Sequence, residues 1–310
     1  MKRWIAPGVI ACGFLTPATL PAQGNWTREV RAPTPRTEVA VAVRDGEIFV
    51  IGGLTRRGVT RLVEVYHPRK RRWRTSASLP LPVHHPGAGV VGKRLYVVGG
   101  FGRGSFWAGA DTLYEYLPRP NAWKKRASMP TARGALGVGV IDGKLHAVGG
   151  RSQRGDVAAH EVYDPATDTW KRLAPMPTAR DHLAAAVLRG RLYAIGGRLG
   201  SYARNLGVNE VYNPRTDAWA TRRPIPTPRS GIAAAVLDGR IFVFGGESVE
   251  GTFADNEGYD PDRNRWTKFA PMPRARHGLG AAAWGGRVFV LSGGPTPGGS
   301  YSGANESFAP

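Results

Sequence analysis

Residues 133–180 read RGALGVGVIDGKLHAVGGRSQRGDVAAHEVYDPATDTWKRLAPMPTAR, and they decide the fold because five further copies of this unit surround them. A repeat of this length is typical of proteins built from similar supersecondary units. Two markers recur every 47 to 50 residues. The first is a pair of glycines, at Gly52-Gly53, Gly99-Gly100, Gly149-Gly150, Gly196-Gly197, Gly245-Gly246 and Gly293-Gly294. The second is a tryptophan, at Trp26, Trp73, Trp123, Trp170, Trp219 and Trp266.

The spacing between the markers shows where the unit varies in length. From each Trp to the second Gly of the next pair there are 27 residues in five units, and 28 in the last, with one extra residue near Ser292. From the second Gly to the next Trp the distance ranges from 20 to 23 residues. Length variation is therefore confined to the loop after Gly-Gly, and we expect function on the face that carries these loops.

Each unit predicts four short strands. Residues 135–141 and 145–148 flank Asp142-Gly143, a strong signal for a tight hairpin. The third strand, residues 161–164, stops at Pro165, and Trp170 opens the fourth. No segment keeps a period of 3.6 residues, so helices should be nearly absent. The first two strands are apolar on both faces, which indicates sheets packed between neighbouring sheets.

These features predict an all-β protein, a six-bladed β-propeller with four-stranded blades. Small residues in the first strand and large ones farther out describe wedges that stack around an axis. The chain begins with a strand of the fourth type, at residues 25–30, and ends with one of the third type, at residues 305–310. We therefore expect the N-terminal strand to complete the C-terminal blade.

The repeat resembles the kelch family. The matching features are Gly-Gly after the second strand, Tyr-Asp-Pro in the third, then Trp, then Met-Pro-x-x-Arg, and they cover about residues 25–310. The resemblance implies a six-bladed kelch propeller and a recognition module.

Residues 1–22 have the order of a secretory signal peptide, with Lys2 and Arg3 before an apolar run that ends in small residues. A lipoprotein site at Cys12, which would hold the protein at a membrane surface, and an uncleaved tail remain alternatives. We expect a secreted or periplasmic protein whose propeller occupies residues 23–310. Cys12 is the single cysteine, so the mature chain would hold no disulfide and no thiolate metal site.

The formal net charge of +20 indicates attraction to polyanions in general. We expect a protein, a peptide or an anionic glycan as the partner, and a monomeric state. Nucleic acid is not an expected partner, because an exported protein would rarely meet it. Compositional bias toward arginine is the alternative explanation of the charge.

Arginines recur where one blade leads into the next, and we expect them around the mouth of the central channel: Arg36, Arg133, Arg180, Arg229 and Arg276, with Val83 breaking the pattern beside His84. Such a ring could bind a carboxylate, sulfate or phosphate. The kelch pattern also implies the alternative that these arginines only tie neighbouring blades together. The loops after Gly-Gly add Arg151 and Arg198, and the two longest carry the aromatic candidates Trp107 and Tyr202.

Signals for chemistry are weak. The seven histidines are scattered, and adjacent residues such as His84 and His85 point apart in an extended chain, so we expect no metal site. No cofactor motif appears. Copper radical oxidases carry similar propellers, but they need a cysteine that this chain lacks.

Two functions follow. The first is a non-enzymatic module that binds a protein, peptide or anionic glycan through the face with the variable loops. The alternative is an enzyme similar to the periplasmic kelch mutarotase of N-acetylneuraminate, which would need one acid and one base near the channel. The candidates for those roles are Glu38, His84, Asp181, His182 and Glu247. His84 and His182 are also expected to contact the ligand of the non-enzymatic module, together with the arginines and aromatic residues named above.

Overall fold

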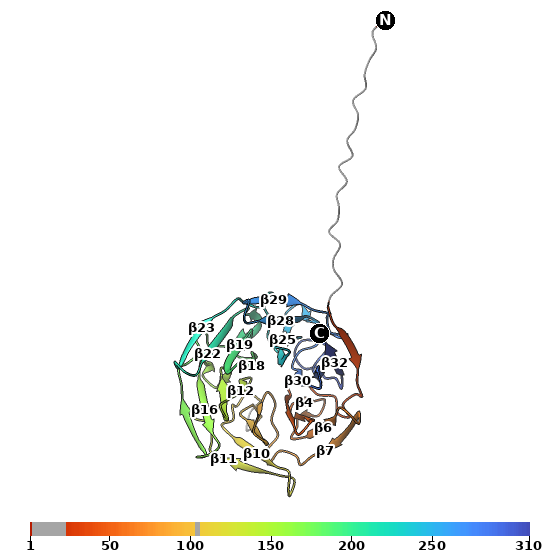
Figure 1. Ribbon diagram of the computed structural model, residues 1–310. Helices are drawn as coiled ribbons and strands as arrows, with labels where there is room; N and C mark the ends of the chain where they lie inside the picture. Colours follow the sequence, from red (N-terminus) through yellow and green to blue (C-terminus); the bar gives the residue numbers. More distant parts are fainter. Residues whose placement is uncertain (2–22, 103–105) are drawn as a thin grey trace.

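The computed structural model describes residues 1, 23–102 and 106–310. They form a ring of six four-stranded antiparallel sheets around a central axis (Figure 1). Side chains of the innermost strands line an open cavity of about 240 Å³ at this axis, the central channel. The first strand of each sheet lies at the axis and the fourth at the rim. No helix occurs among the described residues, as the sequence predicted. Within the same residues, no helical segment has the length and apolar character needed to cross a membrane.

The first three blades share one strand order from the axis outward. Blade 1 consists of β2 (Ala40–Arg44), β3 (Glu47–Ile51), β6 (Val63–His67) and β7 (Arg72–Thr75). Blade 2 consists of β8 (Gly87–Val91), β9 (Arg94–Val98), β10 (Leu113–Leu117) and β11 (Ala122–Arg126). Blade 3 consists of β12 (Gly137–Ile141), β13 (Lys144–Val148), β16 (His160–Asp164) and β17 (Thr169–Arg172).

The remaining blades follow the same order, except that the last one takes its rim strand from the start of the chain. Blade 4 consists of β18 (Ala184–Leu188), β19 (Arg191–Ile195), β22 (Asn209–Asn213) and β23 (Ala218–Thr221). Blade 5 consists of β24 (Ala233–Leu237), β25 (Arg240–Phe244), β28 (Asn256–Asp260) and β29 (Arg265–Lys268). Blade 6 consists of β30 (Gly280–Trp284), β31 (Arg287–Leu291), β32 (Asn305–Ala309) and β1 (Asn25–Arg28).

The seam of the ring is closed as the sequence predicted. Strand β1 pairs antiparallel with β32, and Trp26 lies opposite Phe308. The indole nitrogen of Trp26 also donates a hydrogen bond to the carbonyl of Ala270 in blade 5, at 2.8 Å. The N-terminal strand therefore covers the edge of β32 that would otherwise be exposed.

The glycine pairs join neighbouring blades. The amide of the second glycine donates to the carbonyl of the residue that leads into the next blade, as in Gly150 to Arg180 at 2.9 Å. A Cβ on the first glycine, Gly149, would lie 2.9 Å from that same carbonyl oxygen, and its φ is +61°. Both the close approach and the left-handed backbone therefore favour glycine at this position.

In blade 6 the position equivalent to the glycine pair lies one residue earlier than the sequence predicted. Ser292 has a φ of +60° and Gly293 a φ of +100°, the values found at the first and second glycines of the other pairs. The Gly293 amide donates to the Arg36 carbonyl at 2.8 Å, which is the junction between blades. The equivalent pair is thus Ser292-Gly293, not Gly293-Gly294. The distance from Trp266 is then 27 residues, as in the other units, and there is no extra residue before the pair.

Candidate functional site

Short hairpins extend the loops after Gly-Gly on one face of the ring. They are β4 (Leu54–Thr55) with β5 (Gly58–Val59), β14 (Arg151–Ser152) with β15 (Gly155–Asp156), β20 (Arg198–Leu199) with β21 (Ser201–Asn205), and β26 (Glu247–Ser248) with β27 (Gly251–Thr252). Two of these hairpins, together with the loop that carries Trp107, surround a pocket of about 480 Å³. Predicted residues from three different loops therefore meet at one site.

The pocket has aromatic and charged walls. Its lining includes Trp107, Arg151, Asp181, His182, Arg198 and Tyr202. Five of these were predicted binding residues and Asp181 was a predicted acid or base. The Arg198 guanidinium lies over the Tyr202 ring, with its central carbon 5.7 Å from the ring centroid. Trp107 is 47% exposed, so it offers its ring to solvent at the rim of the pocket.

Below the pocket, a closed ring of six backbone hydrogen bonds encircles the axis. Each blade contributes one residue, whose amide donates to the carbonyl of the equivalent residue in the preceding blade at 2.7 to 3.0 Å. All six residues have left-handed φ values between +50° and +66°. They are Glu38, His85, Ala135, His182, Gly231 and Gly278. We call this set the axial ring.

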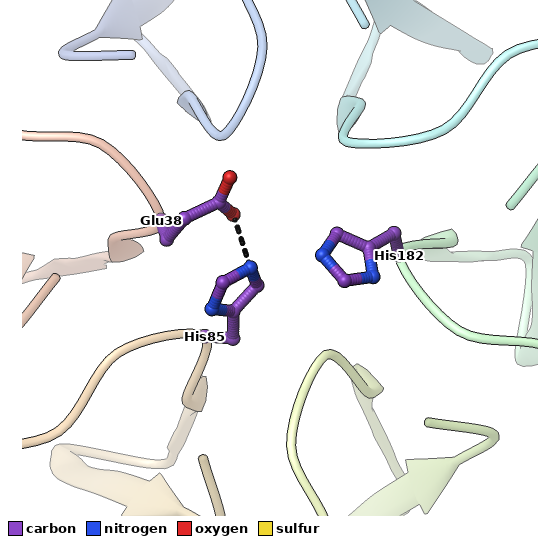
Figure 2. A group of neighbouring side chains, drawn as sticks. All are labelled: Glu38, His85 and His182. Carbon is purple, nitrogen blue, oxygen red and sulfur yellow. Dashed lines mark ion pairs between the residues drawn. The ribbon is translucent and has the colours of Figure 1, made fainter. Parts of the chain in front are cut away.

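Three members of the axial ring carry ionisable side chains that converge. Figure 2 shows Glu38 and His85 in contact, with His182 facing them from blade 4. The Glu38 carboxylate Oε2 lies 2.9 Å from Nε2 of His85. One nitrogen or oxygen atom from each of the three residues lies within 4.8 Å of the other two. All three side chains are buried.

Charged groups from blades 4, 5 and 6 continue this cluster. Arg198 donates through Nη1 to Glu247 Oε1 at 2.7 Å and through Nη2 to His182 Nε2 at 2.8 Å. His277 Nδ1 lies 3.1 Å from Glu38 Oε1 and 3.4 Å from Glu247 Oε2. The channel mouth therefore holds a connected network of acids and bases, in contrast to the strongly basic chain as a whole.

Burial and neighbouring charges set the protonation of this network. Desolvation opposes ionisation of Glu38, but His85 and His277 still hold the pKa of its carboxyl well below the usual range. Burial alone would lower the pKa of His277, and the hydrogen bond and charge of Glu38 raise it above the ordinary value. Burial and the nearby Arg198 charge lower the pKa of His182. Near neutral pH the cluster thus contains a neutral His182 beside ionised carboxylates.

The five arginines predicted around the channel mouth lie inside the blades. Each is at most 1% exposed, and its guanidinium is occupied by backbone carbonyls and one glutamate. Arg180, for example, donates to the carbonyls of Gly196, Thr178 and Ala194 and, through Nη1, to Glu210 Oε2 at 2.6 Å. The other four are Arg36, Arg133, Arg229 and Arg276, paired with Glu64, Glu161, Glu257 and Glu306. The expectation of an open guanidinium ring is wrong, because strand carbonyls and these glutamates occupy the donors.

Blade 2 lacks both members of the buried arginine–glutamate pair. Val83 stands where the other blades have Arg, and Tyr114 stands where they have the glutamate, because Tyr114 pairs with Val97 of β9 as Glu64 pairs with Val50 of β3. Glu115 is the next residue of β10, and Arg126 of the rim strand β11 donates to it through Nε at 2.7 Å. Blade 2 therefore keeps a buried carboxylate paired with an arginine, but at a different position.

The two adjacent histidines of blade 2 do not point apart. His84 Nδ1 lies 2.5 Å from His85 Nδ1, and the ring centroids are 4.7 Å apart. His85 has a φ of +53°, so the chain turns at this residue and the alternation of an extended strand does not apply. His84 Nε2 contacts the carbonyl of Phe106 at 2.8 Å, which links the cluster to the Trp107 loop. Burial lowers the pKa of His84 to about 3.

The axial ring was not predicted as a unit. The signal lies in the repeat itself, because each member stands two residues after the link position held by Arg36 in blade 1 and by Val83 in blade 2. Aligning all six units at that position would have placed Glu38, His85 and His182 together. Ser152, Gln153 and Ser201 also line the pocket, and no motif marks them.

A solved structure described as "Structure of YjhT" has the same fold. It superposes with a TM-score of 0.79 over 89% of this chain and 95% of that chain, at 16% sequence identity. At this identity the likeness concerns the fold alone.

Curated relatives match over short segments. Kelch-like protein 26 of Danio rerio is 30% identical over 82 residues, which are 26% of this chain and 14% of that protein. Beta-scruin of Limulus polyphemus is 35% identical over 79 residues, 24% of this chain and 8% of that protein. The matches thus span about a seventh or less of the length of these relatives.

The profile of the kelch motif covers most of the repeats. It matches residues 35–80, 82–130, 132–177, 179–224 and 228–273, which correspond to blades 1 to 5. Blade 6 has the same four-stranded order, with its rim strand supplied from the N-terminus. The chain belongs to the kelch-repeat family.

Proposed function

We propose that this protein is an exported recognition module that binds a partner protein at the pocket formed by Trp107, Arg151, Arg198 and Tyr202. The observation that carries the proposal is the exposure of Trp107, 47% exposed, at a pocket that also presents arginine and tyrosine side chains. Phe106, equally exposed, lies against Trp107 and extends this aromatic surface. Large aromatic residues and arginine dominate the energetic centres of protein interfaces.

The shape of the site favours a partner that inserts a protruding segment into the pocket. The pocket of about 480 Å³ can take one or two side chains from a loop, and the surrounding hairpins offer an exposed rim. Members of the kelch family typically serve as protein-interaction modules, which adds to this inference. Export is part of the proposal and rests on residues 1–22, of which residues 2–22 lie outside the described part of the chain.

The other partners and activities receive less support. Arg151 and Arg198 each contact an acidic side chain, at 3.1 Å to Asp156 and 2.7 Å to Glu247, so the pocket has little free positive charge for an anionic glycan. The mutarotase alternative is not favoured, since Glu38, Asp181 and Glu247 are each already paired with a histidine or an arginine.

Site-directed crosslinking tests the proposal. A photoreactive amino acid replaces Gln153, which lines the pocket, or Lys93, which lies in the β8–β9 turn on the opposite face. We expect one protein to crosslink at position 153 and not at 93. Purified, that partner should bind the unlabelled protein, and W107A and Y202A should each weaken the equilibrium affinity at least tenfold. W284A, next to the turn between β30 and β31, is the matched control and should leave the affinity unchanged.

Three results would overturn the proposal. The first is a partner whose affinity is insensitive to W107A and Y202A. The second is specific binding on a glycan array with no protein partner. The third is accelerated anomer exchange of sialic acid, measured by NMR, that is lost on changing Glu38 or His182.

A further inference from the structure

Four of the six residues in the axial ring carry a side chain in a backbone conformation that favours glycine. The φ values of the three ionisable ones, Glu38, His85 and His182, are +54°, +53° and +50°; Ala135 has a φ of +53°, and the other two positions are Gly231 and Gly278. A residue with a side chain in this region costs about 1–2 kcal/mol. Strain of this kind is concentrated at functional sites. The six backbone hydrogen bonds of the ring also fix the three Cα positions relative to one another.

The hydrogen bonds around His85 leave a place for a cation. His84 Nε2 faces the carbonyl of Phe106, so this nitrogen carries the proton and His84 Nδ1 is an acceptor. His85 Nδ1, 2.5 Å away, then donates to it. In a neutral His85 the remaining nitrogen, Nε2, has a lone pair that faces Glu38 Oε2 at 2.9 Å. Two acceptors at this distance require a proton or a metal ion between them.

His182 is arranged in the same way on the opposite side of the cluster (Figure 2). Its Nδ1 lies 2.9 Å from Asp181 Oδ1, which accepts the ring proton. Its Nε2 lone pair is directed to the inside of the ring, where it accepts from Arg198 Nη2. A carboxylate that holds the outer nitrogen of a histidine is the usual support of a metal ligand.

We propose that Glu38, His85 and His182 form a binding site for a first-row divalent metal ion such as Zn²⁺. Each proposed ligand has a supporting partner: His277 for Glu38, His84 for His85 and Asp181 for His182. Two imidazoles and one carboxylate suit zinc, which in open sites binds three protein ligands and one further oxygen donor.

Small side-chain rotations bring the three ligands onto one ion. The donor atoms now lie within 4.8 Å of one another, and zinc requires bonds of about 2.0–2.2 Å. Arg198 must release its bond to His182, and it keeps its bonds to Glu247 and Asp181 when it does. His182 lines both the space between the three ligands and the larger pocket, so the fourth coordination position is accessible to a donor bound there.

This site was not expected from the sequence. Glu38 and His85 are 47 residues apart, and His85 and His182 are 97 residues apart. They come from blades 1, 2 and 4, so no short sequence motif identifies them as metal ligands. The proposal is independent of the partner protein, because metal binding is measured without one.

Titration calorimetry of the full chain, first stripped with EDTA, tests the site with Zn²⁺ alone. We expect one ion per chain. Loss of a residue that supports a metal ligand typically lowers metal affinity by roughly 10–100-fold, and we expect D181N to lower the Zn²⁺ affinity by that amount. E38Q, H85N and H182N each remove a ligand and should lower the Zn²⁺ affinity by more. Asparagine tolerates the left-handed conformation, so H85N and H182N add no backbone strain. Thermal unfolding of each variant verifies that it is folded.

Two controls use histidines elsewhere. H146F removes one member of a second buried histidine pair, His146 and His160, whose ring nitrogens lie 2.9 Å apart, and H67A removes a histidine on strand β6. Both variants should bind Zn²⁺ as the wild type does. The proposal is overturned if the wild type binds no Zn²⁺, if binding persists unchanged in E38Q, H85N and H182N, or if it is lost only in H146F or H67A.

Discussion

The guanidinium of Arg180 lies 2.6 Å from the carboxylate of Glu210, and both side chains are at most 2% exposed. The pair joins the segment entering blade 4 to the third strand of that blade, and the Arg180 carbonyl accepts from Gly150 of blade 3. One residue therefore connects its own blade to the preceding one. Four other blades repeat this arrangement, which identifies these arginines as structural.

We expect R180M to lower the free energy of unfolding by about 3–5 kcal/mol, because it leaves a buried carboxylate without its cation. The double variant R180M/E210L should recover part of this loss. R263A, which removes an exposed partner of Asp260, should change stability by no more than about 1 kcal/mol. Urea unfolding followed by tryptophan fluorescence measures all three. A loss in R180M no larger than that in R263A would contradict the structural role.

Truncation tests the closure of the ring. A chain that begins at Pro33 lacks β1 and exposes the edge of β32, whereas a chain that begins at Gln23 retains the strand. We expect the shorter chain to lose at least about 3 kcal/mol, comparable to truncation of one buried tryptophan, and to self-associate through the free edge. Thermal unfolding and size-exclusion chromatography compare the two chains. Equal melting temperatures would show that blade 6 is stable with three strands.

Sequence periodicity was sufficient to predict the fold because each unit repeats the same local rules. Asp142 and Gly143 have the positive φ values that the predicted hairpin requires. Each of the six tryptophans lies in a fourth strand, as predicted, and its indole donates to a carbonyl of the preceding blade, as in Trp170 to Ala127 at 2.8 Å. The single error in the repeat, at Ser292, arose because a serine can occupy the left-handed position of the first glycine.

The site was predicted less well because burial cannot be read from residue type. Arg180 and Arg198 are both arginines near the channel, yet Arg180 is fully enclosed by its own blade while Arg198 lines the pocket. The convergence of His84 and His85 depends on one backbone torsion angle, which a local sequence pattern does not reveal. Binding by the predicted residues Trp107, Tyr202 and Arg151 stays a prediction.

The buried pair His146 and His160 predicts loss of stability in acid. Burial is the main cause that lowers the pKa of His146 to about 4 and that of His160 to about 3. The folded state therefore binds fewer protons than the unfolded chain below pH 6.5, so stability is complete above that pH and declines as the pH falls toward 3. Between pH 7.5 and pH 5 the loss is about 2 kcal/mol for each histidine.

The repeat supplies a matched variant for this test. The position of His146 is Phe242 in blade 5, and that of His160 is Asn256, whose amide donates to a backbone carbonyl as His160 Nδ1 does. We expect H146F/H160N to show a flatter dependence of unfolding free energy on pH between 7.5 and 5. Urea unfolding at each pH measures it, and parallel profiles for the two proteins would refute the assignment.

Close packing at the axial ring predicts unequal effects of the same substitution at two glycines. Gly231 and Gly278 have φ values of +66° and +58°, so alanine is strained at both by about 1–2 kcal/mol. A Cβ at Gly231 would lie 3.3 Å from its nearest neighbour, whereas one at Gly278 would lie 2.3 Å from Thr37 Oγ1 and 2.5 Å from Glu38 Oε1. We expect G278A to lose about 1–3 kcal/mol more than G231A, because Glu38 and Thr37 must move. Urea unfolding compares the two variants, and equal losses would mean that the Glu38 carboxylate is not held against Gly278.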